Sequence, residues 1–233
     1  MVKNSEQPAK VVIHIFRHGE RPLDSITSGN LTVRGRTQGT AIGKTLANEL
    51  GKTKTQKIVK FYASPVGRNM QFQSLIRGSL MRAVRTQKLP VKVLASRAEE
   101  KFKYGKIRDQ KWFDALYGDL SLEEFNQRWI QGKTHTSIVE QPAEVLARIR
   151  RNAEEFGVRV SGQYTGRPVE VHIVIVTHGD LMGVLREQIT RRQAMLGKQK
   201  TKFGERIKLT LRGRKGAYET RGFKKTILLR RPK

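Results

Sequence analysis

The chain has 233 residues, with 47 Lys and Arg against 20 Asp and Glu, so its formal net charge at pH 7 is +27. This length is enough to bury one large core or two small ones, and this charge predicts attraction to polyanions such as nucleic acid or an anionic membrane surface. The absence of cysteine excludes disulfides, thiolate metal sites and cysteine nucleophiles. No apolar run is long enough to span a membrane, and residues 1–10 contain no apolar segment typical of a secretory signal.

Up to about residue 190, predicted strands alternate with predicted helices. Short apolar runs predict strands at 11–16, 57–63, 91–95 and 169–176. Apolar residues at helical spacing predict helices at 37–50, 70–84, 142–156 and 181–189. The alternation predicts an α/β fold, a three-layer α/β/α arrangement around a mainly parallel sheet. In such sheets, ligands bind beyond the carboxyl ends of the strands.

Two segments break the alternation. Residues 96–136 contain most of the aromatic side chains among mixed charges, and we expect a helical insertion over the ligand site. Residues 191–233 contain 16 Lys and Arg against two acids, with strands predicted at 206–211 and 226–229 around a glycine-rich turn region. We therefore expect an α/β domain over 1–190 and a basic C-terminal segment that completes the same domain. We also expect the excess charge to lie with this segment, away from the ligand site.

Four short motifs point to one chemistry. In chain order they are RHGER at 17–21, LTxxGxxQ at 31–38, ASPxxR at 63–68 and THGD at 177–180. His18, Ser64 and His178 directly follow predicted strands, so the parallel sheet is expected to bring them together. Histidine is a nucleophile at neutral pH when one ring nitrogen is free, and arginine binds two phosphoryl oxygens through its planar fork. The motifs therefore predict phosphoryl transfer through a histidine.

Each residue of this set has an expected part in that chemistry. We expect His18 to attack phosphorus, and Arg17 and Arg68 to form an arginine clamp on the phosphoryl oxygens. Arg21 and Ser64 are expected to bind the substrate beside them. Gly19 is expected to let the substrate approach the backbone closely.

With these motifs, the chain resembles the histidine phosphatase superfamily, also called the phosphoglycerate mutase-like family, from about residue 11 to residue 185. The resemblance implies that His18 becomes phosphorylated, and that Arg17, Arg68 and His178 occupy the family's phosphate-binding positions. The RHGER sequence is more similar to phosphatase-type members than to glycolytic mutases. One departure is Phe72, which stands where the family usually has threonine.

The resemblance leaves the proton donor open between three acids. The family usually takes an acid from the segment after the third strand, where Glu100 is the nearer candidate and Glu99 the other. Asp180, two residues after His178, is a third candidate by analogy with the acid-phosphatase branch. A general acid needs a raised pKa, whereas basic neighbours of the two glutamates favour their ionised form.

Two functional hypotheses follow. The first is a metal-independent phosphomonoesterase with a phosphorylated substrate, no cofactor and no metal, because no two histidines have a ligand spacing with carboxylates. The alternative is a histidine-phosphatase-like fold that binds RNA or another polyanion through the basic C-terminal segment. Such a protein would be a structural component of a ribonucleoprotein such as a mitochondrial-type ribosome, with little or no catalysis. The sequence indicates no compartment, and a mitochondrial one is compatible with the alternative.

The remaining histidines and aromatics have simpler interpretations. His14 and His172 lie inside apolar strands and are predicted to be core histidines with their polar atoms satisfied. The aromatic residues between 102 and 129 are predicted to pack in the core and not to stack on bases, because they do not align on one strand.

Overall fold

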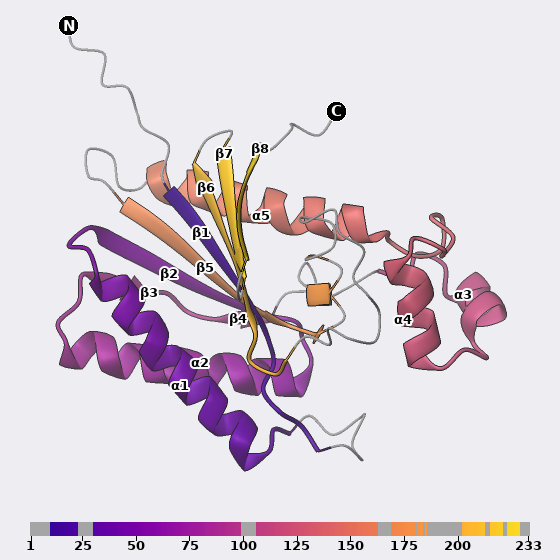
Figure 1. Cartoon of the computed structure of the whole chain (residues 1–233), viewed down its shortest axis with the longest axis horizontal. Coiled ribbons are helices and arrows are strands. Elements are labelled where there is room, and N and C mark those ends of the chain that lie inside the picture. Colours follow the sequence, from indigo (N-terminus) through magenta and orange to yellow (C-terminus); the bar gives the residue numbers. More distant parts are fainter. Residues whose placement is uncertain are drawn as a thin grey trace, which may run out of the picture.

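The chain forms one eight-stranded sheet with helices on both faces (Figure 1). A computed structural model describes residues 10–22, 30–98, 106–162, 169–179, 181–183, 185, 202–212, 215–220 and 223–228. The strands are β1 (Lys10–Arg17), β2 (Gln56–Ala63), β3 (Val91–Val93), β4 (Arg97–Ala98), β5 (Val169–Thr177), β6 (Arg206–Arg212), β7 (Lys215–Thr220) and β8 (Phe223–Leu228). The helices are α1 (Val33–Gly51), α2 (Gly67–Thr86), α3 (Gln110–Tyr117), α4 (Leu122–Ile130) and α5 (Pro142–Gly162).

The sheet is mainly parallel. Its strand order is β3-β2-β5-β1-β6-β7-β8, and β4 also pairs with β2. Strands β1 to β5 pair in parallel, whereas β6, β7 and β8 form antiparallel pairs. Helices α1 and α2 lie on one face and α5 on the other (Figure 1), which confirms the predicted three-layer α/β/α class.

The register of the three central strands aligns their carboxyl ends. Arg17 at the end of β1 is level with Thr177 at the end of β5, and Ala63 at the end of β2 is level with Val176. The residues that follow these strand ends, His18, Ser64 and His178, therefore lie at the same end of the sheet. This alignment is the physical reason that motifs more than 100 residues apart in sequence meet in one place.

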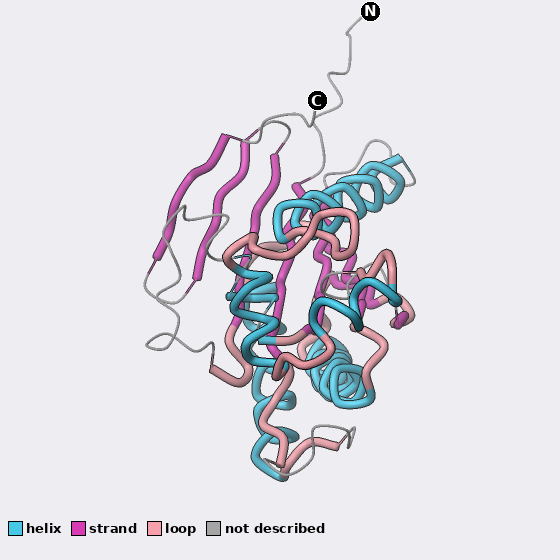
Figure 2. The backbone as a smooth tube through the Cα atoms, turned by 90° about the vertical axis from the view of Figure 1, so that its right-hand side faces the viewer, coloured by secondary structure: helices cyan, strands magenta, loops and turns pink. Residues whose placement is uncertain are grey.

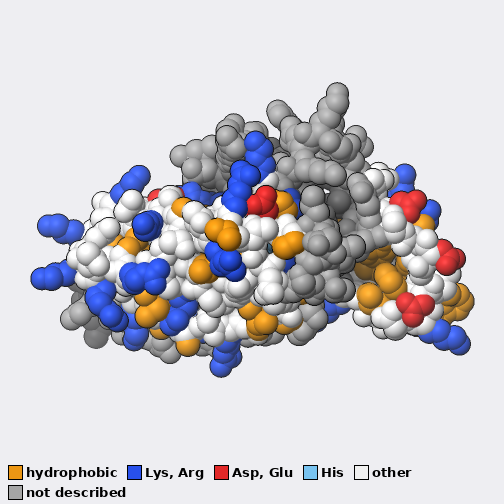
Figure 3. All heavy atoms as spheres, turned by 90° about the horizontal axis from the view of Figure 1, so that it is seen from below, with side chains coloured by type: hydrophobic (Ala, Val, Ile, Leu, Met, Phe, Trp, Pro, Cys, Tyr) orange, Lys and Arg blue, Asp and Glu red, His pale blue; other side chains and the backbone are white. Residues whose placement is uncertain are grey.

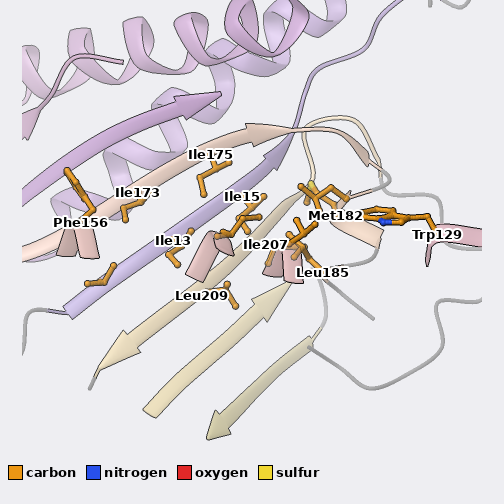
Figure 4. Packing of buried hydrophobic residues seen from close by; sticks show 14 of the residues in the cluster. Ile13, Ile15, Trp129, Phe156, Ile173, Ile175, Met182, Leu185, Ile207 and Leu209 are labelled. Atoms are coloured by element: carbon orange, nitrogen blue, oxygen red, sulfur yellow. The ribbon is translucent and has the colours of Figure 1, made fainter. Parts of the chain in front are cut away.

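Two apolar cores hold the layers together, one on each face of the sheet. Because successive side chains of a strand point to opposite faces, Ile13 and Ile15 of β1 join the core under α5, while Phe16 joins the core under α1 and α2. Figure 4 shows the first core, where side chains of β1, β5 and β6 meet Phe156 and Trp129. The buried strand residues explain why these runs are continuously apolar.

Helices α1 and α2 pack closely because α1 has a row of glycines, two of which face α2. Gly35, Gly39 and Gly43 are buried at intervals of four residues; Gly39 and Gly43 lie against α2, whereas Gly35 lies against the backbone of Glu20. A methyl group at Gly43 would lie 2.5 Å from the carbonyl oxygen of Ile76, far below a normal contact distance. The row therefore brings α1 within backbone contact of α2, which carries the arginine of the third motif.

The C-terminal strands extend the sheet past β1 (left in Figure 2). Strand β6 pairs antiparallel with β1, so the basic segment and the motif-bearing strands share one sheet. The strand over 206–211 and a later one were expected, but β7 was not, because Gly216 and its neighbours indicated turns. Pairing with β6 and β8 on both sides forms β7 despite its glycine.

The segment expected as a helical insertion contains α3 and α4, which lie at the right of Figure 1. Ser121 caps α4 through a reciprocal pair of hydrogen bonds with Glu124. Trp129 is fully buried, and its indole N–H donates to the carbonyl oxygen of Glu140 at 2.7 Å. Packing is thus the role of the buried aromatics, as expected, although Trp112 is exposed. Phe102 and Tyr104 lie outside the described residues.

His14 and His172 are buried in the sheet as a pair. His14 Nε2 lies 3.1 Å from His172 Nδ1, so one ring donates to the other, and His172 Nε2 lies 3.5 Å from Glu170. Burial and neighbouring positive charge lower the pKa of His14, and burial lowers the pKa of His172. Their place in the core is confirmed, but the expectation of satisfied polar atoms is wrong, because His14 Nδ1 and His172 Nε2 have no hydrogen-bond partner in the described part of the chain.

Candidate active site

His18 is the buried centre of the candidate site. It directly follows β1, and its backbone N–H donates to the carbonyl oxygen of Thr177 at 3.0 Å, which ties it to the end of β5. Its side-chain Nδ1 lies 2.7 Å from the carbonyl oxygen of Gly19. A carbonyl can only accept, so Nδ1 carries the proton and Nε2 keeps its lone pair. The backbone thereby selects the tautomer that a nucleophile requires.

The surroundings of His18 keep its ring neutral. Burial lowers its pKa from the usual 6.5 to about 4. The bond to Gly19 opposes this shift, whereas the positive charges of three arginines, Arg68, Arg17 and Arg21, reinforce it. At neutral pH the Nε2 lone pair is therefore available, and the arginines that disfavour an imidazolium would favour an anion beside it.

His178 faces His18 with its ring nearly perpendicular, at a centroid distance of 5.8 Å. Asn69, which is fully buried on α2, places its amide nitrogen 3.0 Å from His178 Nε2. Ser64 Oγ lies 3.5 Å from the same nitrogen. The shorter contact is the stronger bond, so Asn69 is the main hydrogen-bond partner of Nε2.

The second ring nitrogen of His178, Nδ1, lies beside the arginine of the third motif. Arg68 Nη2 lies 3.5 Å from this nitrogen, and Arg68 is the second residue of α2. Burial lowers the pKa of His178 to about 3, followed by the charges of His18 and the three arginines. A neutral imidazole and a guanidinium that lie this close can contact the same anion.

Phe203 is a site residue that the sequence analysis missed. It lies in the turn before β6, and its ring centroid is 5.7 Å from that of His18. The guanidinium carbon of Arg17 lies 4.1 Å from the Phe203 ring centroid, within cation–π range. The turn is fixed to the first motif, since Arg17 N–H donates to Glu205 and Gly204 N–H donates to the His18 carbonyl. No motif identifies Phe203, because only the pairing of β6 with β1 brings it to the site.

The second motif positions the loop that follows His18. Thr32 caps α1 by accepting from the N–H of Gly35 at 3.0 Å, and its hydroxyl also contacts Glu20. Gln38 accepts from the Glu20 N–H at 3.0 Å. These contacts explain the spacing of the motif: each polar residue binds the same loop from one side of α1.

Gly19 has a packing role in addition to the one expected. A methyl group at Gly19 would lie 2.6 Å from the carbonyl oxygen of Gly35 and 2.7 Å from the ring of Phe72. The glycine therefore allows the loop after His18 to rest directly on α1 and α2. Phe72, which departs from the family pattern, is the buried floor of this contact.

The structure brings together most of the predicted site residues. These are Arg17, His18, Gly19, Ser64, Arg68 and His178, and the charge of Arg21 acts on both histidines. The proton-donor candidates Glu99, Glu100 and Asp180 lie outside the described residues, as do residues 99–105 of the expected insertion. Among the described residues, no cluster of three or more His, Asp and Glu is arranged to hold a metal ion. No described helix combines the length and hydropathy required to cross a membrane.

Comparison with known proteins assigns the chain to a family. The family model of the histidine phosphatase superfamily (branch 1) matches residues 13–201. No curated protein matches the chain significantly. Among solved structures, a mycobacterial glucosyl-3-phosphoglycerate phosphatase is 18% identical with a TM-score of 0.47, and 86% of this chain and 90% of that chain are covered. Bacillus stearothermophilus YhfR is 16% identical with a TM-score of 0.49, covering 90% of this chain and 95% of that one.

Proposed function

Because this chain belongs to the histidine phosphatase superfamily, we propose that it is a metal-independent phosphomonoesterase acting through a phosphohistidine on His18. The observation that favours this most is the 2.7 Å contact between His18 Nδ1 and the Gly19 carbonyl. It leaves a neutral Nε2 facing a region of positive charge from three arginines. A neutral nucleophile next to fixed cations is what attack on a phosphate dianion requires.

In the first proposed step, the Nε2 lone pair of His18 forms a bond to phosphorus while the ester P–O bond breaks. The electron pair of that bond leaves with the alcohol oxygen. Arg17, Arg68 and His178 stabilise the equatorial oxygens as charge redistributes. Ser64 and Arg21 hold the substrate beside them. A carboxylic acid donates a proton to the leaving oxygen, and we propose Glu100 for this role, with Glu99 and Asp180 as alternatives.

In the second step, water attacks the phosphohistidine. The carboxylate formed in the first step takes a proton from the water, the P–N bond breaks, and inorganic phosphate leaves. His18 returns to its neutral form with Nδ1 still bonded to the Gly19 carbonyl. The cycle consumes one water and releases one alcohol and one phosphate, so no cofactor is needed.

The test is hydrolysis of p-nitrophenyl phosphate in EDTA by the wild type, His18→Ala and His135→Ala, after nuclease treatment and a high-salt wash. His135 is an exposed histidine and serves as the matched control. We expect His18→Ala to abolish hydrolysis and an acid-labile phosphate to be trapped on His18 in the wild type. Equal activity in His18→Ala and the wild type would refute the mechanism.

The proton donor can be identified by the leaving group. A good leaving group such as p-nitrophenolate needs little protonation, whereas an alkoxide needs a full proton. We expect Glu100→Gln to slow hydrolysis of an alkyl phosphate much more than that of p-nitrophenyl phosphate. If Glu99→Gln or Asp180→Asn shows this selectivity and Glu100→Gln does not, the role belongs to that residue.

A second candidate function is a structural role in a ribonucleoprotein, with RNA bound through the basic C-terminal segment. The net charge of +27 favours it. Retention of RNA until the salt wash, with no hydrolysis by the wild type, would support this function over the enzyme.

A further inference from the structure

The helices α1 and α2 and the strands around them form the most one-sided charge distribution among the described residues. Residues 30–98 contain 14 Lys and Arg but only one acid, Glu49. That acid is paired with Arg206 at 2.7 Å. This imbalance nearly equals that of the C-terminal 43 residues, so the basic tail is not the only location of the excess charge.

Six of these basic residues share one end of the α1–α2 layer. They are exposed, and they lie in the second halves of the two helices or in the loops that follow them. We call them the distal basic face: Lys44, Lys52, Lys54, Arg82, Arg85 and Lys88. Figure 3 shows blue Lys and Arg side chains over this half of the molecule, while red side chains gather at the opposite end, over α3 and α4.

This face is far from the candidate active site. Arg68 and Arg85 lie at opposite ends of α2, which is 20 residues long. At 1.5 Å per residue, their backbones are about 25 Å apart. Lys54 likewise precedes β2, whereas the site follows its last residue. The cations of the distal basic face therefore do not bind the small substrate of the site.

No described acid neutralises the face. The six side chains form no ion pair with any residue that the structure describes. The surface of α3 and α4 is different, because Asp109, Asp114, Asp119 and Glu124 lie there among its basic residues. Like charges on one face repel each other, and a bound polyanion removes that repulsion.

An anionic membrane, an acidic protein or a nucleic acid could bind such a face. The exposed apolar and aromatic side chains near the face distinguish between these partners. Anionic membranes are held by cations together with inserted apolar side chains, and protein partners need buried aromatic or aliphatic anchors. The exposed large apolar residues of α1 and α2 are Val33 and Met70, both at the start of their helices and so at the other end. Single strands are bound by stacking on aromatic side chains, and no described aromatic residue of α1 or α2 is exposed.

We propose that the distal basic face binds a nucleic acid duplex through its phosphate backbone. A duplex presents rows of phosphates along a rigid axis, which suits cations spread over two packed helices that expose no aromatic or large apolar residue at this end. Such binding is independent of sequence, because the contacts are made to phosphates and not to base edges. The proposal does not depend on the phosphatase function.

The test measures binding of a 20-base-pair RNA duplex and a DNA duplex of the same sequence by fluorescence anisotropy, between about 50 and 200 mM salt. The face variant is Lys52→Gln, Lys54→Gln and Lys88→Gln. The control variant is Lys111→Gln, Arg128→Gln and Lys133→Gln, which removes the same charge from the exposed α3–α4 surface. Thermal unfolding of both variants establishes that they are folded.

We expect the face variant to bind at least one duplex roughly tenfold more weakly and to lower the slope of log K against log salt by roughly 2 to 3. The control variant should bind like the wild type. Comparison of the two duplexes shows whether RNA or DNA is the source of the phosphates. A preference for either one supports the proposal that the distal basic face binds a duplex.

Three results would overturn the proposal. Equal weakening in both variants would mean that only net charge matters, and no weakening in either would place the binding elsewhere, for example in the C-terminal segment. Tighter binding of the wild type to phosphatidylserine vesicles or polyglutamate than to both duplexes would identify a membrane or an acidic protein as the partner. Hydrolysis of p-nitrophenyl phosphate by the same preparations tests the phosphatase function separately, since neither variant changes the site.

Discussion

The two ends of the α1–α2 layer both present cations, but they do so by different physics. At the carboxyl ends of the strands, Arg17 and Arg68 are partly buried and act on two buried histidines. At the other end, the six cations of the distal basic face are exposed. Charges shielded from water interact strongly at short range, whereas exposed charges are screened by salt. The first arrangement suits one small phosphoryl group held in place, and the second suits a long polyanion held loosely.

The largest expected effect comes from removing one arginine at each end of α2. Arg68→Ala should lower kcat/KM for p-nitrophenyl phosphate by roughly 10²- to 10³-fold, because a fixed donor to the phosphoryl oxygens is lost. Arg85→Ala near the other end of the helix should leave kcat/KM within about twofold of the wild type. Steady-state kinetics at constant salt measure both, and similar losses in the two variants would contradict the contrast.

The next effect concerns Phe203, which has no counterpart on the exposed face. Phe203→Ala removes the ring beside the Arg17 guanidinium, and a cation–π contact contributes about 0.5–2 kcal/mol. We expect kcat/KM to fall roughly threefold to thirtyfold. Phe203→Trp should restore most of the activity and Phe203→Leu should not, because leucine keeps the bulk but not the π face. Equal activity of the Leu and Trp variants would reduce Phe203 to a packing residue.

A smaller effect is expected from mild acid. The folded-state pKa of His18 is lowered to about 4 and that of His178 to about 3, so the unfolded chain binds protons first. Stability contributed by the neutral histidines is therefore present above pH 6.5 and is lost as the pH falls toward 4. We expect kcat/KM to fall on the acid side only near pH 4. Circular dichroism at each pH establishes that the protein is still folded. An acid limb near pH 6.5 in folded protein would show that His18 is solvated.

The smallest effect should be that of salt on the small substrate. Raising salt from about 50 to 200 mM should change kcat/KM for p-nitrophenyl phosphate only severalfold, while duplex affinity falls by orders of magnitude. Both are measured on one preparation. Parallel salt dependences would mean that the two ends bind their anions in the same way.

Local patterns in the sequence were sufficient to place the site. Apolar, β-branched runs identified β1, β2 and β5, and the residues directly after them were predicted to converge. Burial on both faces of a parallel sheet makes such runs easy to identify, and parallel register aligns their ends. The position of His18 could be predicted for the same reason, because it depends on one strand end and one neighbouring carbonyl.

Other features depend on contacts that no local pattern encodes. Phe203 reaches the site because β6 pairs with β1. Asn69 reaches it because the first turn of α2 directs this side chain toward His178. The close approach of α1 to Gly19 likewise depends on the packing of the whole layer.

The sequence by itself determined the family and the layer architecture and predicted the candidate nucleophile, since these depend on residue types at fixed short spacings. It also determined the amount of charge, but it directed attention to the C-terminal segment, where basic residues are adjacent along the chain. Only the tertiary structure decided that basic residues scattered between 44 and 88 form one exposed face. A helix places residues three or four apart on the same side, and the packing of two helices joins two such sides. Neither the side of a helix on which a residue lies nor the packing of two helices can be deduced from the order of charges along the chain.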